Sequence, residues 1–335
     1  MKRAAAALLI LFVGVAARAE EIRIEVARGL KVARVEAGGR ARTVVPADAP
    51  IAFMGPLKLD GRDLAGKLEL FADRGALLAV NVVDLEQYVA AVVASEVPSS
   101  WPAPALEAQA VAARTFAVAQ KIASGPGARA HLGASVLDQV YKNSAAPPAS
   151  ALAAAKATAG EVLTWGAAPI AAYFSASCGG VSESAESAFH LSPGTTPYLR
   201  GGEKDDDERG WTARIALNDI AAALHRAHRM DGDVRQIKIA KRTSSGRADA
   251  LRVETSKGTH PLAAVELRQL IGYDKLPSLF FDVERDGAAA VFHGRGSGHG
   301  VGLCQYGARQ RALKGETYRQ ILARYYPGAE LRRMY

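Results

Sequence analysis

The feature that most constrains this chain is an apolar helical stripe that runs into a carboxylate. The stripe repeats at the i, i+3, i+4, i+7 and i+8 spacing of a helix that faces a core, and its members are Leu85, Tyr88, Val89, Val92 and Val93. Glu96 occupies the next position of the same stripe, and Pro98 ends the helix because it lacks a backbone donor. The pattern predicts a buried helix that directs Glu96 toward apolar surroundings.

This placement should raise the pKa of Glu96. Partial burial disfavours a carboxylate, and so does the negative end of a helix dipole. A Glu whose pKa is raised toward neutrality is suited to general acid catalysis. The alternative is a Glu that rotates outward at a frayed helix end and pairs with a Lys or Arg.

The first nineteen residues are typical of an export signal. A positive start at residues 1–3 is followed by an apolar run at 4–15 and by the small-x-small pattern of residues 17–19, with cleavage expected after Ala19. The run is short for a membrane span. We therefore expect a mature protein in the periplasm, cell wall or medium, without a transmembrane anchor once the signal is cleaved. An uncleaved N-terminal anchor is the alternative.

Charge and composition limit the partners. Hydrophobic residues make up 49% of the 335 residues and charged residues 23%, which indicates a globular protein. Loss of Lys2, Arg3 and Arg18 with the signal lowers the formal net charge from +8 to +5 (8 minus 3). A mildly basic exported protein suits anionic surfaces such as the cell wall. The basic residues are scattered and lack an aromatic-rich basic motif, so we expect no nucleic-acid partner.

The two cysteines leave three interpretations open. Cys178 and Cys304 each lie in a Gly-rich stretch. An exported protein with two cysteines permits one disulfide. Two buried free thiols, or a metal-binding or catalytic role, are the alternatives.

The order of predicted elements indicates an α+β fold with mainly antiparallel strands around a cleft, because helices and strands do not alternate regularly. Residues 20–83 form a β-rich N-terminal region and residues 84–335 the main domain. The predicted helices are 84–96, one following Pro102, 149–159 and 262–271, with one or two more near the C-terminus. The predicted strands after residue 84 are 170–177, 234–241 paired with 249–256, 279–284 and 289–293.

Four ordered blocks resemble the stage II sporulation protein D family (SpoIID/LytB). They begin with the stretch from Asn81 that contains SEVP at 95–98, and continue with LDQVYKN at 137–143, AAYFSASCGGVSESAE at 171–186 and GRGSGHGVGLCQYGARQRA at 294–312. The resemblance covers roughly residues 80–330. It implies a lytic transglycosylase that cleaves between N-acetylmuramic acid and N-acetylglucosamine and leaves a 1,6-anhydro end, with Glu96 as the single acid/base. Glu107, Glu183 and Glu186 are backup candidates.

The other blocks predict substrate contacts. The candidates are Arg114, Tyr173, Ser175, Ser177, Gly179, Gly180, His299, Gly300, Gln305 and Tyr306. The glycines have an alternative role in tight turns, and Arg114 has one in an ordinary ion pair.

One departure and one competing function follow from the resemblance. Some family members carry a zinc-binding Cys/His pattern before the QVY stretch, but here Asp138 precedes Gln139 and no Cys is near. We therefore expect no zinc and no other cofactor.

The expected partner is the peptidoglycan glycan strand. The alternative function is a non-catalytic wall-binding protein that enhances a cell-wall amidase; a purely structural exported protein is a third.

Overall fold

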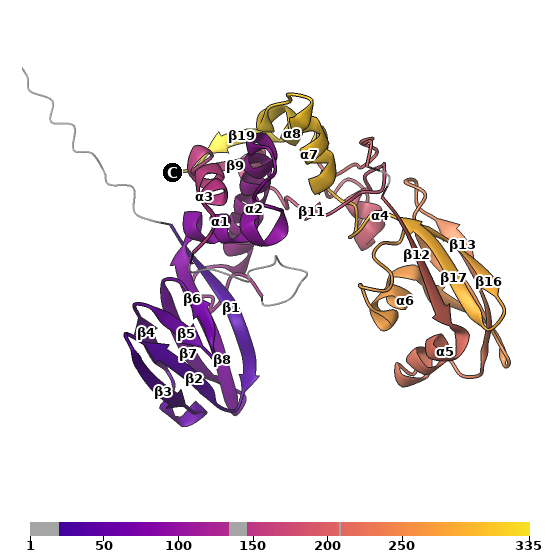
Figure 1. The fold of residues 1–335 in the computed structure, drawn as a ribbon, viewed down its shortest axis with the longest axis horizontal. Coiled ribbons are helices and arrows are strands. Elements are labelled where there is room, and N and C mark those ends of the chain that lie inside the picture. Colours follow the sequence, from indigo (N-terminus) through magenta and orange to yellow (C-terminus); the bar gives the residue numbers. More distant parts are fainter. Residues whose placement is uncertain (1–19, 134–145, 208) are drawn as a thin grey trace, which may run out of the picture.

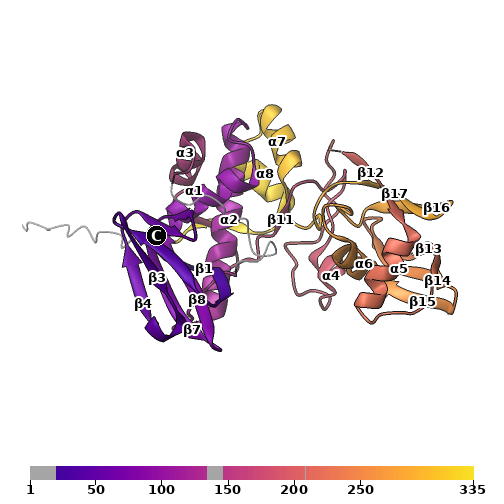
Figure 2. The ribbon, with the colours of Figure 1, turned by 60° about the horizontal axis from the view of Figure 1, so that its bottom comes forward.

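The computed structural model describes residues 20–133, 146–207 and 209–335. The signal segment and most of the LDQVYKN block fall outside these ranges. Within them, an N-terminal β unit, a helical centre and a C-terminal unit follow one another along the long axis of the molecule (Figures 1 and 2). Helices and mainly antiparallel strands in separate sheets confirm the predicted α+β class.

The N-terminal unit consists of two four-stranded sheets packed face to face. One sheet has the order β1-β8-β7-β4 and the other β3-β2-β5-β6. Its strands are β1 (Glu21–Leu30), β2 (Ala33–Ala37), β3 (Arg40–Val44), β4 (Ile51–Met54), β5 (Leu57–Leu59), β6 (Arg62–Leu64), β7 (Lys67–Asp73) and β8 (Ala76–Asp84), with a short 3-10 helix at Pro46–Asp48. Buried aliphatic side chains of both sheets, such as Val35 and Leu70, form a shared core.

Strand β8 leads directly into the helix that carries Glu96. Helix α1 (Leu85–Glu96) begins where Asp84 Oδ1 accepts hydrogen bonds from the backbone N–H groups of Glu86 and Gln87, at 2.9 and 3.0 Å. All five side chains of the predicted stripe are buried. The helix ends at Glu96, as predicted, and Val97 is extended.

The helical centre surrounds one long helix. Helix α2 (Ala103–Ser124) packs against α1 and against elements from both ends of the remaining chain. These are α3 (Ala149–Ala157), β9 (Glu161–Trp165), β10 (Ala168–Pro169), α7 (Gln305–Leu313) and α8 (Tyr318–Tyr325). Strand β19 (Glu330–Arg333) pairs with β9. In the described ranges, no helix is both long and apolar enough to cross a membrane.

The C-terminal unit contains two three-stranded antiparallel sheets with two helices. The orders are β12-β17-β16 and β13-β14-β15. The elements are β12 (Gly210–Ala216), α5 (Leu217–Arg226), β13 (Val234–Arg242), β14 (Ala248–Thr255), β15 (Gly258–Ala263), α6 (Ala264–Ile271), β16 (Phe281–Asp286) and β17 (Ala289–Arg295). The β13–β14 hairpin confirms the predicted pair of strands.

The segment between the helical centre and the C-terminal unit corrects one prediction. The sequence predicts a strand over 170–177, but only β11 (Phe174–Ser175) is a strand, and it pairs in parallel with β18 (Leu303–Cys304). Other backbone groups of the segment bond to loops, as when Ser177 exchanges two hydrogen bonds with Ser297. The helix α4 (Ala185–Phe189) follows. This irregular path brings several side chains to one pocket.

Candidate functional site

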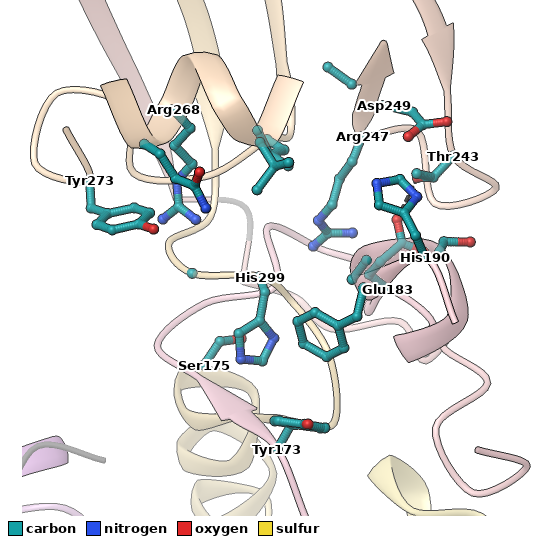
Figure 3. A pocket seen from close by; sticks show the side chains of 18 of the residues that line it. Tyr173, Ser175, Glu183, His190, Thr243, Arg247, Asp249, Arg268, Tyr273 and His299 are labelled. Atoms are coloured by element: carbon teal, nitrogen blue, oxygen red, sulfur yellow. Dashed lines mark hydrogen bonds between the residues drawn. The ribbon is translucent and has the colours of Figure 1, made fainter. Parts of the chain in front are cut away.

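A pocket of about 540 Å³ lies between the helical centre and the C-terminal unit. The end of α1, residues of α2 and β11, helix α4, the β13–β14 turn, helix α6 and the loop at 298–299 all contribute to it. Its lining residues include Glu96, Phe116, Tyr173, Ser175, Glu183, Phe189, His190, Thr243, Arg247, Arg268, Tyr273 and His299. Figure 3 shows the part of the pocket around His299, Arg247 and Arg268. Concave sites with apolar walls and a few polar groups are typical of ligand binding.

Glu96 is half-buried in the wall of this pocket and contacts a distant amide. Gln305 Nε2 donates to Glu96 Oε2 at 3.2 Å and to Gln109 Oε1 at 3.3 Å. Gln305 and Gln109 are 3% and 1% exposed, so surrounding atoms restrain both amides. This network orients one carboxylate oxygen of Glu96 toward Gln305.

His299 lies at the centre of the pocket as a neutral imidazole. Burial lowers the pKa of His299 to about 4, and the positive charges of Arg268 and Arg247 add to this effect. Its Nδ1 accepts a hydrogen bond from the Val301 backbone N–H at 2.9 Å. The ring also contacts Tyr173 and Phe189, with centroids 6.0 and 5.4 Å away. At neutral pH, this wall of the pocket is therefore aromatic and uncharged.

Three of the predicted substrate contacts line the pocket. They are Tyr173, Ser175 and His299. The Ser175 hydroxyl is buried and has no hydrogen-bond partner among the described residues. A buried hydroxyl without a partner is uncommon, so Ser175 remains a candidate for contact with a ligand.

The predicted small residues of the two Gly-rich loops hold those loops together. Ser177 is 3% exposed, and its hydroxyl accepts from the Gly179 backbone N–H at 3.2 Å. Gly180 has a positive φ of 96°, and its carbonyl accepts from the Asp205 backbone N–H. A Cβ at Gly300 would lie 2.2 Å from Arg247 Nη2. This geometry assigns these residues to turns and close packing.

Tyr306 lies outside the pocket lining, next to Gln305. Its ring is 5.0 Å from that of Trp101, and the Arg209 guanidinium lies 3.3 Å from its centroid. Trp101 comes shortly after the SEVP motif. The two motifs that contain Glu96 and Gln305 therefore also meet through these aromatic rings.

The structure does not bring Arg114 to the pocket. Its side chain is fully buried and forms a bidentate ion pair with Glu86, with Nε–Oε1 and Nη2–Oε2 distances of 2.7 and 2.5 Å. Further donors reach the carbonyls of Ala155 and Glu161. These contacts match the alternative interpretation of an ion pair, and they place Arg114 away from the substrate contacts.

The three backup carboxylates occupy different positions. Glu183 lines the pocket but is 1% exposed, and it accepts hydrogen bonds from the Ser184 backbone N–H and from the hydroxyls of Ser245 and Thr243. Glu186 accepts from the Gly194 backbone N–H at 2.6 Å, outside the pocket. Burial and the nearby Glu161 raise the pKa of Glu107, which is also outside the pocket lining. Glu96 is thus the carboxylate of the helical wall.

Of the three interpretations of Cys178 and Cys304, the structure matches two buried free thiols and not a disulfide. Cys304 Sγ accepts hydrogen bonds from the backbone N–H groups of Cys178 and Gly307. A side-chain hydrogen bond with the Cys178 thiol and burial raise the pKa of the Cys304 thiol, which disfavours a reactive thiolate.

The same cysteines and Asp205 place three donor atoms within 4.8 Å of one another. Both Asp205 oxygens already accept from the Tyr325 hydroxyl at 2.8 Å, and Oδ1 also accepts from Arg311 at 3.0 Å. A guanidinium this close opposes a second cation, so the cluster fits a hydrogen-bonded core better than a metal centre.

Sequence reasoning missed several side chains of the site. Gln109 belongs to the Glu96 network, and the lining residues of the C-terminal unit include Thr243, Arg247, Arg268 and Tyr273. None of these four lies in a recognisable motif. Only the position of Gln109 on α2, close in sequence to Glu96, could have suggested a role.

Comparisons with known proteins agree with these motifs. A family model described as Stage II sporulation protein matches residues 73–165, and one described as Domain of unknown function (DUF8618) matches residues 200–302. The chain is 33% identical over 275 residues to Stage II sporulation protein D of Bacillus subtilis, covering 77% of each protein. It is 30% identical over 272 residues to the same protein of Bacillus amyloliquefaciens, covering 76% of this chain and 75% of that one. It is 29% identical over 290 residues to the Amidase enhancer of Bacillus subtilis, covering 72% of this chain but 39% of that protein.

Proposed function

This chain belongs to the stage II sporulation protein D family, and we propose that it is an exported lytic transglycosylase of peptidoglycan. The observation that carries the proposal is the position of Glu96. This carboxylate of the SEVP motif ends a buried helix, is half-buried in a pocket of about 540 Å³ and is held by a buried amide. The N-terminal pattern of residues 1–19 supports the export of this cell-wall protein.

Glu96 supplies the proton that breaks the glycosidic bond. Oε2 accepts from Gln305 Nε2, and we propose that the acidic proton is carried by the other oxygen, Oε1. It passes to the bridging oxygen as the bond from that oxygen to the anomeric carbon of N-acetylmuramic acid breaks. N-acetylglucosamine leaves with a free hydroxyl, and Glu96 becomes a carboxylate.

The same carboxylate completes the reaction without water. The C6 hydroxyl of N-acetylmuramic acid attacks its own anomeric carbon, and Glu96 takes the hydroxyl proton. A new C6–O–C1 bond forms the 1,6-anhydro ring, and the acid is regenerated. Hydrolytic glycosidases generally need a second carboxylate as nucleophile or base, but the substrate's own hydroxyl takes that role here.

Product analysis tests this proposal. Purified peptidoglycan, both intact and stripped of stem peptides, is digested with the mature protein and with Glu96→Gln, and the soluble fragments are identified by mass spectrometry. We expect 1,6-anhydro products from the wild type and a loss of about 10³-fold in the variant. Products with reducing N-acetylmuramic acid ends, or equal release by both proteins, would contradict the proposal.

The likeness to an amidase enhancer favours one second candidate, a wall-binding protein that stimulates an amidase. This function does not require a carboxylate in a pocket. An amidase assayed with and without this protein separates the two functions. Stimulation that is unchanged by Glu96→Gln, with no anhydro ends from this protein alone, would favour the enhancer.

A further inference from the structure

Two arginines of the C-terminal unit line the pocket opposite the helical centre. Arg247 follows the turn between β13 and β14, and Arg268 lies on α6. Both side chains extend from their elements toward the side of the pocket where His299 lies (Figure 3). The effect of both positive charges on the pKa of His299 agrees with this arrangement.

The positive charge of Arg247 is balanced by groups of the protein itself. Arg247 is 3% exposed, and its Nη2 donates to the carbonyls of Cys178 and Val181. Its Nη1 donates to Ser245 Oγ at 2.8 Å, and that hydroxyl donates to Glu183 Oε2 at 2.6 Å. The serine thus connects the guanidinium to a carboxylate.

The described residues include no carboxylate that balances the positive charge of Arg268 in this way. Arg268 Nε and Nη2 donate to the carbonyls of Leu276 and Pro277 at 2.7 and 2.6 Å, which fixes the plane of the guanidinium. The aromatic ring of Tyr273 lies 4.6 Å from it. Among the described residues, no carboxylate oxygen lies within 4.0 Å of its nitrogens. Burial lowers its pKa, because removing a charge from water without a counterion is unfavourable.

The other charged groups of the lining do not neutralise Arg268. Glu183 is connected to Arg247, and Asp249 pairs with Lys241 at 2.6 Å. Glu96 lies in the opposite wall, where it contacts Gln305. His299 is uncharged at neutral pH. Among the described residues of the lining, no carboxylate therefore pairs with the positive charge of Arg268 on the α6 side of the pocket.

We propose that Arg268 forms a carboxylate subsite of the pocket, so that the preferred ligand is a glycan that carries anionic groups. A guanidinium oriented by carbonyls is prepared to bind a carboxylate with two hydrogen bonds. This inference rests on the proposed function and deepens it. The carboxylate is either that of the lactyl ether of N-acetylmuramic acid or one carried by the stem peptide.

The test measures binding without turnover, in the Glu96→Gln background, by isothermal titration calorimetry. Three oligosaccharides of equal length are compared: neutral chitotetraose, a peptide-free muramic tetrasaccharide with lactyl carboxylates, and the same tetrasaccharide with stem peptides. We expect the dissociation constant of at least one anionic glycan to be about 10-fold lower than that of chitotetraose. Whichever anionic glycan binds more tightly identifies the source of the carboxylate.

Arg268→Gln, added to this background, should remove the preference. Its shorter side chain keeps an amide donor near the carbonyl of Leu276 and loses the charge. The dissociation constant of the anionic glycan should rise about 10-fold, with that of chitotetraose unchanged. The matched control is Arg235→Gln, on the exposed surface of β13, which should leave both constants unchanged.

A second measurement on Arg268→Gln requires no ligand. The pKa of His299, followed by NMR, should rise in Arg268→Gln because one of the charges that lower it is gone. If Arg268→Gln does not fold, Arg268→Lys and the salt dependence of anionic glycan binding by the parent protein provide the test, since weaker binding at higher salt is expected.

The outcomes separate this inference from the proposed function. Equal binding of neutral and anionic glycans, or an equal loss of both in Arg268→Gln, overturns the carboxylate subsite. The proposed function still stands in that case if the wild-type protein releases anhydro products. Absence of binding by every glycan overturns the subsite, and absence of anhydro products overturns the function.

Discussion

The helical centre and the C-terminal unit use arginine in opposite ways. Arg114 in the centre is fully buried and satisfied by a bidentate Glu86 and by backbone carbonyls. Arg268 in the C-terminal unit is fixed by two carbonyls but has no carboxylate partner among the described residues. The difference indicates that the first arginine stabilises the fold and that the second is available to a ligand.

Breaking the Arg114 pair should have the largest effect on stability. Arg114→Ala leaves Glu86 without its main partner, and loss of one member of a buried ion pair costs about 3–5 kcal/mol. Urea denaturation of the variant should show this decrease in the free energy of unfolding. The double variant Glu86→Leu/Arg114→Met should recover part of the lost stability. A decrease in the free energy of unfolding of less than about 1 kcal/mol in Arg114→Ala would show that the pair contributes little.

Protonation of His299 should have the next largest effect. An unfolded His has a pKa near 6.5, and the folded value is about 4. Between these values the unfolded chain binds a proton that the folded chain does not, so stability falls as the pH falls from 6.5 to 4, by up to about 3 kcal/mol. Denaturation measured across this range should show the loss, and His299→Gln should reduce the slope. An unchanged slope would exclude His299 as its source.

Loss of the amide that holds Glu96 should reduce activity moderately. Gln305→Leu removes the donor to Glu96 Oε2, and a less restrained carboxylate should lower kcat about 10-fold with little change in KM. The matched control is Gln310→Leu, on the same helix and away from Glu96. Rates of anhydro product release check this prediction. A normal kcat in Gln305→Leu would remove the positioning role.

Removing the charge of Arg268 should change stability least. The described residues supply no counterion for this cation, so Arg268→Gln should alter the free energy of unfolding by less than about 1 kcal/mol. Thermal and urea denaturation of this variant, beside Arg114→Gln, directly tests the comparison of the two arginines. A loss as large as that of Arg114→Gln would mean that both arginines are structural.

Local patterns predicted much of the fold. The apolar stripe and Pro98 located α1 and its end near Glu96, and the predicted pairing of 234–241 with 249–256 located the β13–β14 hairpin. The prediction of a strand over 170–177 was wrong because that segment pairs with distant loops rather than with a long neighbouring strand.

The far wall of the site could not be predicted in this way. Gln305 and Glu96 are 209 positions apart. The sequence assigned both to one site only because each lies in a recognisable motif. Arg247 and Arg268 have no motif, and their importance arises from the three-dimensional balance of charge. Arg114 was expected to contact substrate because a sequence does not reveal that Glu86 lies opposite it.

The most direct test compares the carboxylates of the two walls in one assay. Anhydro product release from peptidoglycan is measured by mass spectrometry for Glu96→Gln and Glu183→Gln, with circular dichroism to confirm that each variant is folded. Our account predicts that Glu96→Gln loses about 10³-fold in activity, while Glu183→Gln retains most of it because Glu183 is committed to Ser184, Ser245 and Thr243. Full activity of Glu96→Gln, or loss of anhydro products only in a folded Glu183→Gln, would contradict it.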